Sequence, residues 1–89
     1  MGARLVADLT ERDRLVGWVE VNGKTIDLLG SKAEGTWEIY GGPSDEYRAE
    51  GRSTVRAALV DFARACGSEH GHLEIGYEYL GEGSRYHTF

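Results

Sequence analysis

The clearest pattern along the chain is an apolar stripe with helical spacing between residues 53 and 66. Apolar side chains recur there every three or four residues, at Val55, Ala58, Leu59, Phe62, Ala63 and Cys66. Ser53 or Thr54 can supply the N-cap oxygen, and Gly67 stands where a left-handed residue commonly ends a helix. The pattern predicts one amphipathic helix, Ser53–Cys66, that packs its apolar side against the rest of the chain.

Before this helix, the hydrophobic positions follow the period of short strands. Asn22-Gly23 separates the segments Leu15–Val21 and Lys24–Leu29, and this dipeptide is the strongest local signal for a two-residue hairpin turn. The turn sets a register in which Val19 pairs with Ile26 and Trp18 pairs with Asp27. One face of the hairpin is then apolar, whereas Trp18 lies on the other face among polar neighbours.

Further strands are predicted on both sides of this hairpin. They are Arg4–Leu9, Thr36–Tyr40 after a turn at Gly30–Gly35, a short edge strand at Glu46–Glu50, an alternating segment from Leu73 to Leu80, and a returning strand at Arg85–Phe89. The sequence therefore predicts an α+β fold in a single domain over residues 1–89. Its small, mostly antiparallel sheet consists of a β-meander and a C-terminal β-hairpin, with the helix packed on one face.

The composition narrows the classes of partner. Ten Lys and Arg stand against fifteen Asp and Glu, for a net charge of −5. This balance opposes nonspecific nucleic-acid binding and suits a basic protein partner, although the same charge also keeps a small protein in solution. The single cysteine excludes an internal disulfide framework, and no apolar run approaches the length of a membrane span. We expect a cytoplasmic protein without a signal peptide or membrane segment.

Few residues in the sequence are candidates for catalysis or for metal or phosphate binding. Cys66, His70, His72 and His87 are the grouping with metal-ligand residue types, but their spacing matches no standard zinc module and Cys66 falls on the apolar stripe. Carboxylates such as Glu74 and Glu78 occupy outward strand positions, and no glycine-rich loop stands between a strand and a helix. We therefore expect no catalytic residue, no metal, no cofactor and no enzyme activity.

Two functional classes remain. The first is a small acidic protein-interaction module, and in size and charge the chain is similar to antitoxins and phage-encoded anti-CRISPR inhibitors. Such a module would bind a basic or nucleic-acid-handling protein. Exposed tryptophan and tyrosine among carboxylates are the residues expected to bind the partner, or a second copy in a homodimer. They are Trp18, Glu20, Asp27, Glu38, Tyr40, Glu74 and Glu78.

The alternative is a nucleic-acid-binding domain with a three-stranded sheet braced by a helix, as in AP2-like and integrase arm domains. Trp18, Lys24, Trp37 and Arg48 would then lie on the sheet. Carboxylates stand among these residues, where phosphates would have to approach, so nucleic acid is the less favoured partner. The remaining basic cluster, formed by Arg52, Arg56 and Arg64, suits a nucleic acid or the acidic face of a second copy equally.

Overall fold

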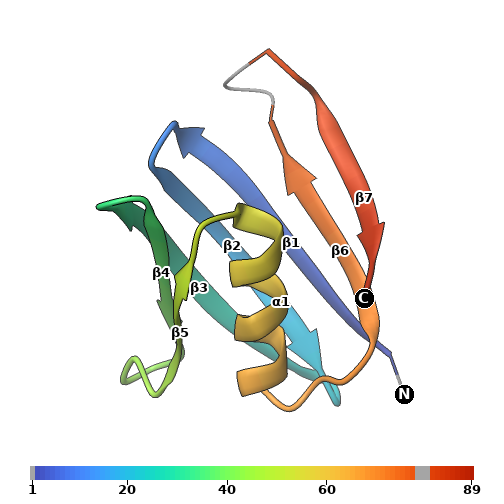
Figure 1. Cartoon of the computed structure of the whole chain (residues 1–89). Helices are drawn as coiled ribbons and strands as arrows, with labels where there is room; N and C mark the ends of the chain where they lie inside the picture. Colours follow the sequence, from blue (N-terminus) through green and yellow to red (C-terminus); the bar gives the residue numbers. More distant parts are fainter. Residues whose placement is uncertain (1, 78–80) are drawn as a thin grey trace.

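The computed structural model describes residues 2–77 and 81–89, in which seven strands form one mixed sheet (Figure 1). The strand order is β5-β4-β3-β2-β1-β6-β7, and every neighbouring pair is antiparallel except β1 and β6, which are parallel. The strands are β1 (Ala3–Glu11), β2 (Arg14–Val21), β3 (Lys24–Ala33), β4 (Thr36–Gly41), β5 (Tyr47–Arg52), β6 (Gly71–Gly76) and β7 (Ser84–Thr88).

This architecture confirms the α+β class and the mostly antiparallel sheet. The sheet is nevertheless larger than predicted, and it contains one parallel pair. The three-stranded sheet of the nucleic-acid-binding alternative is wrong. The physical reason is that β1 accepts strands on both of its edges, so the C-terminal hairpin extends the meander into one sheet instead of standing apart from it.

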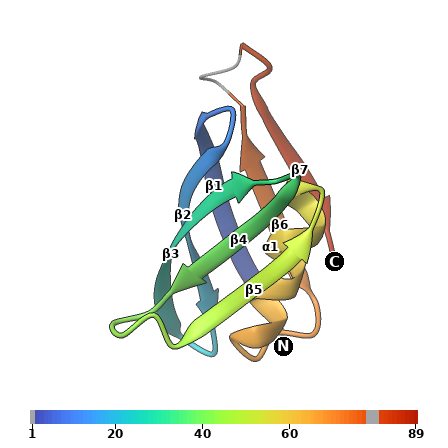
Figure 2. The ribbon, with the colours of Figure 1, turned by 60° about the vertical axis from the view of Figure 1, so that its left-hand side comes forward.

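Helix α1 (Val55–Ala65) crosses one face of the sheet, because it connects β5 at one edge to β6 near the other. The sheet curls around it, so that β4 and β5 contact one side of the helix while β1 and β6 contact the other (Figure 2). The Thr54 hydroxyl accepts a hydrogen bond from the amide of Ala57 (3.3 Å), and Cys66 is the C-cap. These ends confirm the predicted helix and its N-cap.

The hairpin register is also confirmed. Trp18 pairs with Asp27, and the positive φ angles of Asn22 (54°) and Gly23 (75°) are those that a type I′ turn requires. In contrast, the turn predicted over Gly30–Gly35 is wrong. Strand β3 continues to Ala33, and the chain reverses at Glu34-Gly35, whose φ angles are 54° and 82°. The missing asparagine explains why the sequence does not mark this turn as clearly.

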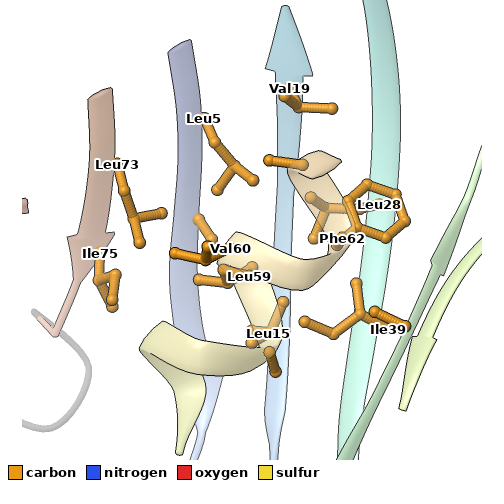
Figure 3. Close-up of a cluster of buried hydrophobic side chains, with 14 of the residues drawn as sticks. Leu5, Leu15, Val19, Leu28, Ile39, Leu59, Val60, Phe62, Leu73 and Ile75 are labelled. Atoms are coloured by element: carbon orange, nitrogen blue, oxygen red, sulfur yellow. The ribbon is translucent and has the colours of Figure 1, made fainter. Parts of the chain in front are cut away.

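The core lies between the helix and the curled sheet (Figure 3). Side chains from five strands meet the helical Leu59 and Phe62, namely Leu5, Leu15, Val19, Leu28, Ile39, Leu73 and Ile75. Val60, which is outside the predicted apolar stripe, is also buried. It is covered because the sheet reaches around the helix instead of lying flat beneath it.

Gly30 lies at a position in this core that has no room for a β-carbon. A β-carbon added to it would lie 2.8 Å from Cγ of Leu15 and 3.1 Å from Cγ1 of Ile39. Both neighbours are fully buried on the adjacent strands β2 and β4. Because Gly30 has no side chain, Leu15 and Ile39 can pack against the backbone in the middle of β3.

The opposite face of the sheet has no second layer among the described residues, and we name it the open face. It is formed by the strand positions that alternate with the core positions. Its larger apolar side chains are Val6, Val16, Trp18, Leu29, Tyr40 and Tyr86.

Candidate protein-docking surface

Every predicted partner-binding residue that the structure describes lies on the open face. Cross-strand pairs establish this placement, because paired residues share a face. Trp18 pairs with Asp27, and Glu74 pairs with Val6, the neighbour of Trp18. The set is Trp18, Glu20, Asp27, Glu38, Tyr40 and Glu74. Glu78 lies outside the described residues. The structure thus brings these side chains to one surface, and their role in binding stays a prediction.

An apolar row crosses the middle of the open face. Val16 on β2 pairs with Leu29 on β3, which pairs with Tyr40 on β4. Val16 is 40% exposed and Leu29 is 53% exposed, so these side chains are not part of the core. Neither was among the predicted binding residues. The hairpin register already places them opposite each other on the outer face, so the signal was present in the sequence.

A second row lies two residues further along the strands. Trp18 on β2 pairs with Val6 on β1, and Tyr86 on β7 pairs with Glu74 on β6. Tyr86 is 72% exposed, and sequence reasoning missed it as a binding residue. Its position on the same face follows from the parallel pairing of β1 with β6. The two rows place exposed apolar side chains on the open face, with Glu74 and Asp27 among them, and uncovered apolar groups bordered by polar ones mark interaction sites.

Arg4 contacts both the ring of Trp18 and the carboxylate of Glu74. Its guanidinium carbon lies 5.7 Å from the centre of the Trp18 ring, within the range of a cation–π contact. Its Nη2 is 3.8 Å from Oε2 of Glu74. Arg4 therefore extends toward β6 as well as Trp18, although the residue directly opposite it on β2 is Glu20. Among the described residues, Glu20 and Asp27 have no ion-pair partner.

The open face is acidic overall. Its carboxylates are Asp8, Glu11, Glu20, Asp27, Glu38, Glu50 and Glu74, and its cations are Arg4, Arg14 and Arg48. Nη2 of Arg48 is 3.1 Å from Oε1 of Glu38, so that carboxylate is already paired. Asp8, Glu20, Asp27 and Glu50 are exposed and have no ion-pair partner in the described part of the chain. The surplus charge is thus interleaved with the apolar rows.

A hollow of about 650 Å³ lies at the end of the open face nearest the Asn22-Gly23 turn, and it opens broadly to solvent. Arg4, Glu20 and His72 contribute to its wall. A second hollow of about 290 Å³ shares Arg4 and His72 and reaches Tyr86. The surface over β1 and β6 is therefore indented, which gives side chains of a docked protein room to enter.

The cysteine and histidine residues considered as metal ligands do not lie together in the structure. Burial raises the pKa of the Cys66 thiol to about 11. His72 lies on the open face, whereas His87, paired with the buried Leu73, lies on the opposite face. Within residues 2–77 and 81–89, no group of three or more histidine, cysteine, aspartate or glutamate side chains is arranged to hold a metal ion.

The basic cluster on the helix side is largely engaged within the molecule. Arg52 donates through Nε to the Asp61 carboxylate (2.6 Å), and Arg56 donates to the Thr88 carbonyl oxygen (3.2 Å). The Asp61 contact raises the pKa of Arg52. Arg64 alone of the three has no such partner in the described residues. This surface is therefore less available to an anion than the sequence indicates.

In the part of the chain that the structure describes, no helix has the length and apolar character needed to cross a membrane. Comparison of the chain with protein-family models, with curated proteins and with solved structures finds no match.

Proposed function

We propose that this protein is an acidic protein-interaction module that binds a basic partner through the open face of its sheet. One observation carries this proposal: exposed apolar side chains and unpaired carboxylates are interleaved on a sheet face without a second layer among the described residues. Aromatic residues that reach solvent in such a setting, here the half-buried Trp18 and Tyr40 and the exposed Tyr86, are typical of binding hot spots. The carboxylates set the charge of the complementary surface, because association favours opposite potentials.

The same interleaving favours a basic partner over a second copy packed face to face. Two open faces would bring carboxylates together, and of the three cations on the face Arg4 and Arg48 already contact Glu74 and Glu38 within each copy, which leaves Arg14 as the one without an ion-pair partner among the described residues. Burial of Asp27 without a cation carries a desolvation cost of several kcal/mol. A partner that supplies arginine or lysine removes this cost while it covers Trp18 and Leu29.

The proposal includes a mode of action. Basic protein surfaces that combine cations with apolar groups are common where proteins bind the phosphates and bases of nucleic acids. A module that covers such a surface inhibits its partner by occupying the nucleic-acid site. Inhibition of a nucleic-acid-handling partner is therefore the mode of action that we propose for this surface.

The test compares the wild-type protein with two variants as bait in extracts of the native host. Leu29→Ser removes an exposed apolar side chain from the open face, and Arg64→Ala is the control on the helix side. We expect a basic protein that is retained by wild type and Arg64→Ala. Its affinity, measured by calorimetry with the purified partner, should fall about tenfold for Leu29→Ser, a loss of about 1.4 kcal/mol that is typical of an interface side chain contributing more than about 1 kcal/mol.

Two results would contradict the proposal. One is a partner whose binding depends on Arg64 and is unaffected by Leu29→Ser. The other is direct binding of the isolated protein to oligonucleotides with a steep dependence on salt, which indicates phosphate neutralisation instead of protein recognition. Competition supplies the test of inhibition, because the bound module should displace nucleic acid from the partner.

A further inference from the structure

The open face divides into two adjoining parts with different chemistry. The first part is apolar and consists of Val16, Leu29 and Tyr40, which form one row across β2, β3 and β4. The second part lies two residues along β2 and β3, where Trp18 stands opposite Asp27. The distance between the parts follows from strand geometry, and two residues along a strand correspond to about 7 Å.

The second part is suited to a cation. Arg4 already places a guanidinium 5.7 Å from the Trp18 ring centre from the β1 side, which shows that this ring accepts a cation. On the β3 side, Asp27 is exposed and has no ion-pair partner among the described residues. Glu20 follows Trp18 by two residues on the same face and is also unpaired there. Arg4 is the cross-strand neighbour of Glu20 but pairs with Glu74, so Glu20 and, on the β3 side, Asp27 both remain without an ion-pair partner among the described residues and can bind a cation of a partner.

We infer that the open face recognises a protein segment in which an arginine or lysine lies about 7 Å from a large apolar side chain. The cation binds against Trp18, Asp27 and Glu20, and the apolar side chain packs on Val16 and Leu29. A segment meets this spacing with the two residues at positions i and i+2 of a strand, or at i and i+4 of a helix. The inference rests on the proposed function and adds the recognition pattern that the partner carries.

Selection from a phage-displayed library of random peptides on the immobilised full chain tests the pattern. We expect enrichment of peptides with a basic and a large apolar residue at one of these spacings. A selected peptide should bind Asp27→Asn about tenfold more weakly and Leu29→Ser about tenfold more weakly, because each variant removes one part of the site. Glu50→Gln, a carboxylate on the same face at the far strand β5, is the matched control and should change affinity less than twofold.

The outcomes separate the inference from the proposed function. Peptides that are acidic, or whose affinity does not respond to Asp27→Asn and Leu29→Ser, overturn the recognition pattern. If binding of the host partner is nevertheless weakened by Leu29→Ser, the proposed function is supported and only the proposed recognition pattern is rejected. A dimer in sedimentation velocity that Leu29→Ser dissociates identifies a second copy as the occupant and overturns both. Unchanged circular dichroism of each variant shows that the fold is intact.

Discussion

The packing around Gly30 gives the most quantitative prediction about this fold. In Gly30→Ala, the new methyl group would lie 2.8 and 2.9 Å from two carbons of Leu15 and 3.1 Å from a carbon of Ile39. Carbon atoms in contact prefer about 3.5–4.0 Å, so the neighbours must move. Leu15 is 1% exposed and Ile39 is fully buried, which leaves them little free space.

We expect Gly30→Ala to lower the free energy of unfolding by about 2–3 kcal/mol, the upper part of the range for an added methyl group in a packed core. For a domain of this size, this loss lowers the melting temperature by about 8–24 °C. Urea denaturation followed by circular dichroism and by the fluorescence of the buried Trp37 measures the change.

A second substitution identifies the cause. Leu15→Ala alone should cost about 2–5 kcal/mol, because it removes the buried Cγ and Cδ carbons, including both that lie nearest the added methyl group. Combined with Gly30→Ala it makes room for the new methyl group, so the double variant should lose about 1–2 kcal/mol less than the sum of the single losses. Strictly additive losses would refute the packing explanation. Gly17→Ala is the contrast, since its added β-carbon would collide with the backbone oxygen of Val6 and shortening a side chain offers no relief.

Three further predictions concern turns, caps and pH. Glu34→Asn should raise the free energy of unfolding by about 0.5–1 kcal/mol, because asparagine tolerates the left-handed conformation at φ 54° better than glutamate does; thermal denaturation measures it. Thr54→Ala should lower the free energy of unfolding by about 1 kcal/mol through loss of the N-cap, and an unchanged urea midpoint would contradict this. The pKa of Cys66 is raised from 9.0 to about 11 in the folded chain, so the unfolded state loses its proton first. Stability should therefore decline between pH 9 and 11 more steeply than in Cys66→Ala, and thiol labelling at pH 8 should be slower in the native protein than in urea.

Local signals account for the parts of the fold that were predicted correctly. Asn22-Gly23 and the stripe from Val55 to Cys66 depend on neighbours within a few residues, and both elements have the predicted type and register. The parallel pairing of β1 with β6 leaves no comparable signal, because its partners are far apart in sequence and no short turn joins them. The predicted sheet was therefore too small.

In the candidate surface, too, the features set by local sequence could be predicted, whereas those set by contacts between distant strands could not. Alternation along each strand, together with the hairpin register, is sufficient to place Trp18, Asp27 and Tyr40 on the outer face. The contacts of Arg4 with Trp18 and Glu74 require the positions of three strands at once, so the sequence does not reveal them. The exposure of Tyr86 likewise depends on the place of β7 at the sheet edge.

The parallel pair also has a consequence for how the chain matures on the ribosome. Strand β1 is made before β6, and its edge opposite β2 stays without a partner until residues 71–76 have emerged. During that interval the nascent meander presents unsatisfied backbone groups beside the apolar residues Leu5 and Leu9, a template for pairing with other chains. Closure then requires a contact between distant parts of the sequence, which slows folding. The pairing of β6 with β1 is thus also the step that ends the exposure of the free edge of β1.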